Sequence, residues 1–380
     1  MKITGIICEY NPFHLGHLKQ FHKIKEQNPD SGIVCLMSGN YVQRGHPAIF
    51  DKSVRAKAAL LSGADLVLEL PVTAALSSAE GFASEGVRIL SSICDDLSFG
   101  AETGSVESLM QIAEALVSEK FSVLLKKELE TGLSFPAARQ QAIEKMGYNG
   151  QLLSLPNNIL AVEYCKAILT QNTNLKPMPI QRLGDYHSTI PDNENPSATF
   201  IRTIIERGEK WSNYAPNTTH ECYKNASVHS LNQAESAILY RLRTMSDSEY
   251  ENLPYGTEGL WHKLMKNARR YATLEEIITQ TKSKRYTRTR LDRMILCAFL
   301  GLAVENLARP APYVRVLALN DKGRKILLKA RQFGDFPNSG EIQDDPFQNI
   351  ENRCDDLYGF FSSTPENPGI TSKRRIFYSN

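Results

Sequence analysis

The sequence predicts an α/β protein, in which a parallel sheet covered by helices on both faces precedes a mainly helical C-terminal domain. Two observations carry this prediction. The first hundred residues alternate short apolar runs with amphipathic stretches, which is typical of a parallel sheet built from strand–helix units. After Arg207 the chain changes to longer polar helical patterns with basic clusters. Because cores usually split beyond roughly 250–300 residues, we divide the 380 residues into domains 1–210 and 211–380, with the boundary near 205–230.

Each expected element rests on a local pattern. Helical spacing places Leu18, Phe21 and Ile24 on one face after the first strand, and Asp51 is an acidic cap candidate for the second helix. Apolar runs predict buried strands at 3–8, 33–37, 65–70 and 96–100 and a short strand at 177–182. Helical patterns cover 51–61, a stretch ending at Leu90, 105–146, 157–169 and 294–304. A loop at 192–196 leads to a helix that Ser197 opens.

Composition limits the class of protein. The chain is 42% hydrophobic and 23% charged, and its net charge of +2 requires any basic surface to be local. Seven scattered cysteines without a Cys-x-x-Cys pair indicate free thiols in a reducing compartment. The longest apolar run, 294–304, is shorter than the roughly 20 residues that span a bilayer, and the N-terminus lacks a secretory cleavage site. We therefore expect a cytoplasmic protein without a membrane partner.

The most informative segment is the turn after the first strand. Asn11-Pro12 ends the apolar run, and His14-Leu15-Gly16-His17 precedes the helical pattern. A strand, a tight turn and a helix N-terminus form a usual phosphate site, and two imidazoles can donate hydrogen bonds to charge that grows on a phosphate oxygen. Gly16 lets a base or backbone come close, because it has no Cβ. The alternatives are two surface histidines or a metal pair. With no third ligand evident nearby, we expect no metal bound by protein groups.

A second motif, Pro196-Ser197-Ala198-Thr199-Phe200-Ile201-Arg202, lies almost the whole first domain away from this turn. Hydroxyls before a helix cap its free N–H groups, and an arginine one turn into the helix can hold a polyphosphate bidentately. An ordinary capped helix with a surface arginine explains the same residues about equally well.

The turn at 14–17 resembles the signature of the HIGH nucleotidyltransferase superfamily. The motif at 197–202 resembles the Ser-Ser-Thr-x-x-Arg element of its adenylyltransferases, with Ala198 in place of the middle serine. The chain is more closely similar to the bacterial tRNA(Met) cytidine acetate ligase family, over essentially its whole length. The matching stretches are 9–17, 37–40 with 43–45, 65–71, 99–102, 156–160, and Arg182 before 185–187. This resemblance implies a Rossmann-like nucleotidyltransferase domain followed by a helical tRNA-binding domain.

Members of that family activate acetate with ATP as acetyl-adenylate and acetylate N4 of the wobble cytidine, position 34, of elongator tRNA(Met). The resemblance implies that His14 and His17 are catalytic and stabilise the α-phosphate, while Thr199 and Arg202 steady the departing pyrophosphate. Mg²⁺ is expected as the counter-ion of ATP, bound mainly by phosphates and water. The implied ATP-binding residues are Ile7, Cys8, Glu9, Tyr10, Asn11, Pro12, Phe13, His14, Leu15, Gly16, His17, Leu18, Lys19, Gln20, Gly100, Asn157, Arg182, Thr199 and Arg202.

Simpler explanations exist for several of these positions. Gly100 could be a strand-end glycine that only supplies a positive φ, Asn157 could be a helix N-cap, and Arg182 could be a surface strand residue. The stretch 43–45 with Lys52 and Arg55 could be a solvated face, or it could receive acetate or the tRNA backbone.

A basic segment in the C-terminal half is consistent with an RNA partner. Residues 282–293 place six basic side chains around Tyr286, and clustered cations with an aromatic favour phosphate contacts and base stacking. The alternative is a solvated basic helix start. We expect tRNA contacts from Lys282, Lys284, Arg285, Arg288 and Arg290.

Two other functions compete with the acetate ligase. A small-molecule adenylyltransferase acting on a phosphorylated metabolite shares the nucleotide motifs, but it needs no basic RNA-binding segment. An RNA-binding protein with a relic nucleotide fold would not need both imidazoles and the Thr199–Arg202 pair.

Overall fold

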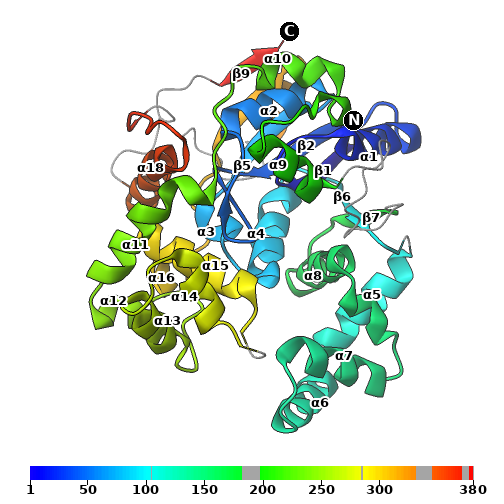
Figure 1. Cartoon of the computed structure of the whole chain (residues 1–380). Coiled ribbons are helices and arrows are strands. Elements are labelled where there is room, and N and C mark those ends of the chain that lie inside the picture. Colours follow the sequence, from blue (N-terminus) through cyan, green and yellow to red (C-terminus); the bar gives the residue numbers. More distant parts are fainter. Residues whose placement is uncertain (104, 182–196, 284–285, 331–344, 370–375, 380) are drawn as a thin grey trace.

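The computed structural model describes residues 1–103, 105–181, 197–283, 286–330, 345–369 and 376–379. Its centre is a seven-stranded sheet with the order β7-β6-β1-β2-β5-β8-β9 (Figure 1). The strands are β1 (Ile3–Cys8), β2 (Gly32–Ser38), β5 (Leu66–Leu70), β6 (Asp96–Ala101), β7 (Lys176–Gln181), β8 (Val316–Asn320) and β9 (Phe377–Ser379). The first five are parallel, as predicted, while β8 runs antiparallel to β5 and β9 runs parallel to β8.

The helices of the first half follow the expected pattern. They are α1 (Leu15–Gln27), α2 (Lys52–Leu61), α3 (Val72–Ala75), α4 (Ala79–Ser91), α5 (Val106–Leu116), α6 (Glu119–Glu130), α7 (Phe135–Lys145), α8 (Pro156–Thr170) and α9 (Ala198–Glu206). Asp51 caps α2 by accepting a hydrogen bond from the Ser53 amide, as expected. The stretch ending near Leu90 consists of two helices, because the Ser78 hydroxyl accepts from the Gly81 amide and starts α4 anew.

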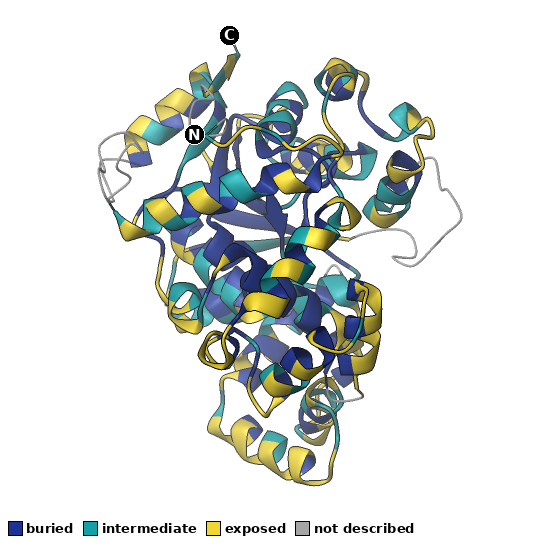
Figure 2. Cartoon of the chain, turned by 60° about the vertical axis from the view of Figure 1, so that its left-hand side comes forward, coloured by how far each residue is buried: buried dark blue, intermediate teal, exposed yellow. Residues whose placement is uncertain are grey.

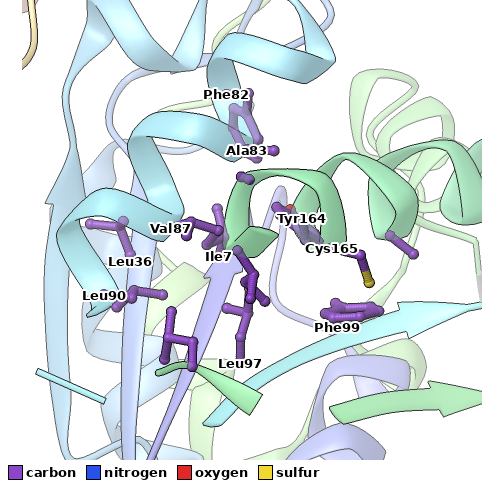
Figure 3. Close-up of a cluster of buried hydrophobic side chains, with 14 of the residues drawn as sticks. Ile7, Leu36, Phe82, Ala83, Val87, Leu90, Leu97, Phe99, Tyr164 and Cys165 are labelled. Carbon is purple, nitrogen blue, oxygen red and sulfur yellow. The ribbon is translucent and has the colours of Figure 1, made fainter. Parts of the chain in front are cut away.

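The sheet buries both of its faces, so successive side chains of a strand enter different cores. Ile7, Leu36, Leu97 and Phe99 pack against α4, α5 and α8 (Figure 3). Ile6, Cys35 and Met37 pack on the other face, against residues of α1, α2 and α9. In Figure 2 the strands at the centre are buried, and exposed residues gather on the outer faces of helices.

A third core belongs to the C-terminal half. It is built mainly from α11 (Glu235–Thr244), α12 (Asp247–Glu251), α13 (Leu260–Ala268), α14 (Leu274–Thr281), α15 (Arg288–Leu300) and α18 (Pro346–Tyr358), with α16 (Val304–Ala308) packed beside it. Residues 294–300 of the apolar run are buried as expected, whereas Val304 at its end is 55% exposed. The helix ends at Leu300 because Gly301 adopts a left-handed conformation (φ 66°). No helix in the described part of the chain is long and apolar enough to cross a membrane.

The predicted second domain also supplies part of the sheet. Strand β8 pairs with β5, and α17 (Asp321–Ala330) then returns against the sheet, where the Ile326 side chain lies against Gly32 of β2. Residues 211–380 are therefore mainly helical, but two of their strands extend the first domain's sheet. The division at residue 210 stays a prediction.

Candidate nucleotide site

The turn between β1 and α1 holds both histidines in fixed positions. His14 is the N-cap of α1 and its Nδ1 accepts a hydrogen bond from the Gly16 amide (3.0 Å), while the His14 amide donates to Nδ1 of His17 (3.2 Å). The two rings stack with centroids 3.7 Å apart. Tyr10, two residues after the end of β1, has a φ of 43°, which is a strained conformation for a tyrosine. Strain of this kind clusters at ligand sites.

These contacts determine where the ring hydrogens lie. A nitrogen that accepts an N–H bond carries no hydrogen itself, so each neutral imidazole keeps its hydrogen on Nε2. The turn thus supplies two oriented Nε2–H donors of the kind that a phosphate oxygen needs. His14 is only 1% exposed, so the alternative of two surface histidines is wrong for this residue.

Gly16 has a local role that the sequence did not reveal. A Cβ at this position would lie 2.9 Å from Cε1 and 3.0 Å from Nδ1 of His14, which is closer than side chains normally approach. The missing side chain therefore makes room for the imidazole itself. The approach of a base or backbone to Gly16 stays a prediction.

Helix α9 brings the second motif to this turn. Arg202 donates from Nη1 to the Asn11 carbonyl (2.9 Å) and from Nη2 to the Thr199 hydroxyl (3.1 Å). Ser197 is the N-cap and accepts from the Phe200 amide at 3.1 Å. Asn11 and Arg202 are about 190 positions apart in the sequence. The two motifs that contain them therefore meet at the carboxyl end of β1.

Gly100 lies on the α1 face of the sheet. It is inside β6, paired with Ile180 of β7, so it is extended and the explanation by a positive φ is wrong. Ser98, two residues earlier, shares its face of the strand and accepts a hydrogen bond from Gln20 of α1 (3.2 Å). Gly100 therefore continues the row from Ser98 toward the carboxyl end of β6.

Asn157 occupies the first turn of α8 and is not its N-cap, because Leu155 holds that position. Its Nδ2 donates to Oε1 of Glu102 at 2.7 Å. Glu102 falls in a stretch that resembles the ligase family, but we assigned it no role from the sequence alone. A carboxylate directly after a buried strand is the signal that could have identified it. Arg182 lies outside the described residues.

Comparisons with known proteins identify the family. The family model described as HIGH Nucleotidyl Transferase matches residues 1–369. A tRNA(Met) cytidine acetate ligase from Clostridium perfringens is 36% identical, covering 95% of this chain and 96% of its own. The chain belongs to the tRNA(Met) cytidine acetate ligase family. A member from Anoxybacillus flavithermus is 34% identical over 94% of both chains.

Solved structures of this ligase family share the fold. Apo Thermotoga maritima TmcAL superposes with a TM-score of 0.91 at 28% identity, covering 100% of this chain and 99% of the other. The same protein bound with alpha-thio ATP gives a TM-score of 0.88 at 29% identity, with both chains fully covered. The predicted nucleotidyltransferase fold is confirmed.

Two basic side chains that follow residues 43–45 in the sequence are buried inside the protein. Arg55 is fully buried and donates to the carbonyls of Phe50, Glu9, Ser38 and Gly39, with its Nη1 2.6 Å from the Glu9 oxygen. Arg55 therefore bonds to the chain at the carboxyl ends of both β1 and β2. Burial lowers the pKa of its guanidinium group. The interpretation of Arg55 as part of a solvated face is wrong.

Lys52 is also buried, with its Nζ 2.7 Å from Glu69 and 2.6 Å from Asp355. The neighbouring carboxylates raise its pKa against the opposing effect of burial. Lys52 is a structural cation, so the solvated-face interpretation fails for it too.

The basic segment of this ligase-family member is only partly available to a phosphate backbone. Lys282 is exposed, whereas Lys284 and Arg285 lie outside the described residues. Arg288 makes a bidentate pair with Glu275, both contacts 2.6 Å long. Arg290 donates to the Tyr255 carbonyl (2.8 Å from Nη2) and to the Thr257 hydroxyl.

Tyr286 is not placed to stack on a base. Its ring is 8% exposed, and its hydroxyl donates to the Glu258 carbonyl at 2.9 Å. The expectation of base stacking in this segment is therefore wrong.

Among the described residues, no group of three His, Cys, Asp or Glu side chains is arranged to hold a metal ion.

Proposed function

We propose that this chain is an ATP-dependent ligase that activates acetate as acetyl-adenylate and acetylates N4 of cytidine 34 in elongator tRNA(Met). The observation that carries the proposal is the convergence of the two-histidine turn with Thr199 and Arg202 at one strand end. Membership of the ligase family, with 36% identity over nearly the full length of a named member, supports the substrate assignment. A tRNA substrate would place the reaction in the cytoplasm.

In the first step an acetate oxygen attacks the α-phosphorus of ATP, and the bond to the β-phosphate oxygen breaks. Negative charge increases on the non-bridging oxygens and on the pyrophosphate, and no protein nucleophile is needed. The Nε2–H groups of His14 and His17 would stabilise the α-phosphate. Arg202 and Thr199 would hold the leaving pyrophosphate. Mg²⁺ would arrive with ATP as part of the substrate.

In the second step the cytidine N4 amine attacks the acetyl carbon, AMP leaves with the electron pair of the broken C–O bond, and the nitrogen gives up one proton. The base must leave its stack to reach the mixed anhydride, so the tRNA backbone has to be held near the site. Lys282, Lys284, Arg285, Arg288 and Arg290 are the residues that we propose for this contact. Of the three that the structure describes, Lys282 is exposed.

The test is transfer of radiolabelled acetate to tRNA. With ATP and elongator tRNA(Met), label should enter the tRNA, and a transcript carrying uridine at position 34 should stay unlabelled. The His14→Ala variant should lose acetyl-adenylate formation. ATP consumption that ignores acetate but depends on a phosphorylated metabolite would instead support the small-molecule adenylyltransferase.

A further inference from the structure

Helix α13 lies along the basic segment and carries cations of its own. The side-chain amide of Asn267 in α13 donates to the Thr281 hydroxyl at the end of α14 (2.9 Å), and the Tyr286 hydroxyl donates to the Glu258 carbonyl just before α13 (2.9 Å). The chain from Thr281 to Tyr286 therefore runs back along α13, from near its end to the loop before its start. Lys282 lies in this stretch and is exposed. Figure 1 shows α13, α14 and α15 together in the C-terminal half of the chain.

The outer face of α13 has an excess of positive charge. From residue 259 to residue 273 the chain contains four lysines and arginines and no aspartate or glutamate. Lys263 and Lys266 lie one helical turn apart on one face, the first half-buried and the second exposed. Asp247, an acid of the neighbouring α12, pairs with Arg269 at 2.8 Å. Lys263 and Lys266 therefore present positive charge that no acid of their own stretch of chain balances.

The loop before α13 connects this face to the nucleotide turn. Tyr255 in that loop has a φ of 69°, a strained conformation of the kind that clusters at functional sites. Arg290 donates to the Tyr255 carbonyl (2.8 Å), and the Arg293 guanidinium lies 4.7 Å from the centre of the Tyr255 ring. Arg293 also donates to the Gln43 carbonyl (3.4 Å), and the Gln43 amide donates to the Glu9 carboxylate (2.8 Å). A series of direct contacts thus leads from the start of α13 to the segment after β1.

We infer that Lys263 and Lys266 of α13 join Lys282 in one surface that binds the phosphate backbone of the tRNA. This inference rests on the proposed function, which makes tRNA the substrate. Lysine binds phosphate as a point charge on a flexible stem. Because the cytidine must leave its stack to reach the mixed anhydride, the backbone beside it has to be held on a surface that is connected to the nucleotide turn. Membership of the tRNA(Met) cytidine acetate ligase family favours RNA over an acidic protein as the partner.

The test measures binding of elongator tRNA(Met) to the full chain between about 50 and 200 mM salt. Lys263→Gln combined with Lys266→Gln removes two charges but keeps long polar side chains. The slope of log affinity against log salt concentration should therefore fall by about 2. At about 0.1 M salt this change corresponds to roughly hundredfold weaker binding. Lys263→Arg combined with Lys266→Arg keeps both charges and should keep the wild-type slope.

Two lysines of α6 provide the matched control. Lys126 and Lys127 are both exposed, and replacing both with glutamine changes the net charge by the same amount as the double variant of α13. Lys126→Gln combined with Lys127→Gln should bind tRNA with the wild-type slope. An equal fall in slope for this control would show an effect of net charge alone, and the inference would then be wrong.

Acetate-dependent ATP–pyrophosphate exchange, measured without tRNA, shows whether each variant is folded at the nucleotide site. If the double variant does not fold, Lys263→Gln and Lys266→Gln should each lower the slope by about 1. A wild-type slope in the glutamine variants, or a loss that the arginine variant shares, would overturn the inference. Transfer of labelled acetate tests the proposed function separately. A wild-type chain that binds tRNA without acetylating it would count against the ligase, and the comparison of slopes would still test α13.

Discussion

Replacing Gly16 with alanine should impair chemistry while leaving the fold almost unchanged. The added Cβ would lie 2.9 Å from Cε1 of His14, about 0.5 Å inside the 3.4 Å at which ordinary contact begins. The ring must move away and its hydrogen bond from the residue 16 amide lengthens. A 1 Å misplacement of a catalytic group costs about 10²-fold, so a shift of half that size should lower acetate-dependent exchange by about tenfold.

The stability of this variant should change little, because two effects oppose each other. Alanine is favoured over glycine inside a helix by about 1 kcal/mol, and loss of one hydrogen bond costs about 1 kcal/mol. Urea denaturation should therefore place Gly16→Ala within about 1 kcal/mol of the wild type. A large loss of stability would show that the clash is absorbed by the backbone and not by the ring.

A double-mutant cycle identifies the ring as the cause. If Gly16→Ala acts by displacing the His14 imidazole, it should have almost no further effect in a His14→Ala background, because effects that pass through one group are not additive. The reasoning would be refuted by a full tenfold loss in that background, or by wild-type exchange in the single variant.

Three other outcomes follow from the contacts. Arg202→Ala removes the bonds to Asn11 and Thr199 and should raise the KM for ATP about tenfold, which corresponds to the loss of roughly one hydrogen bond. Arg207→Ala, at the exposed end of the same helix, should leave the KM unchanged. Equal KM values for the two variants would remove Arg202 from the site. Lys282→Ala should weaken tRNA binding and reduce its salt slope by about 1 without altering exchange. Arg290→Ala should weaken tRNA binding and also lower the urea midpoint, because Arg290 is bound to Tyr255 and Thr257; an unchanged urea midpoint in Arg290→Ala would contradict this. Burial, together with the Glu69 carboxylate, raises the pKa of Glu351 to about 8. Between about pH 4.5 and 8 the folded chain therefore binds one more proton at this group than the unfolded chain does. The contribution of Glu351 to stability falls as the pH rises through that window. Glu351→Gln should flatten that part of the curve of urea midpoint against pH, and an unchanged slope would assign the pH dependence to other groups.

The sequence was sufficient for the elements that have a local cause. The strands at 3–8 and 66–70 are mostly apolar and buried at every position, and the helix at 52–61 has its own aspartate cap. Strand β8 carries a similar apolar run, but its place beside β5 depends on pairing with residues about 250 positions away. No local pattern specifies such a partner.

The same limit applies to the candidate site. The histidine turn could be predicted because its polar residues lie within one short segment. The burial of Lys52 and Arg55 could not be predicted, because a lysine or arginine is rarely buried unless it is paired. Here the partners are Asp355 for Lys52 and the carbonyls at the ends of two strands for Arg55. Those groups converge only in the folded chain, so the sequence left a solvated face and a contact to acetate or tRNA equally open.

Packing, rather than a linker, connects the nucleotide turn to the C-terminal helices. The hairpin formed by β3 (Tyr41–Val42) and β4 (His46–Pro47) contacts the segment after β1. Within it, the Gln43 amide donates a hydrogen bond to the Glu9 carboxylate at 2.8 Å. At its tip Gly45 has a φ of 81°, and a Cβ there would lie 2.3 Å from the Arg293 backbone nitrogen of α15. The Gly45 backbone therefore lies directly against α15. The strand end that we assign to ATP and the helix that begins in the basic segment are joined by this packing as well as by the chain.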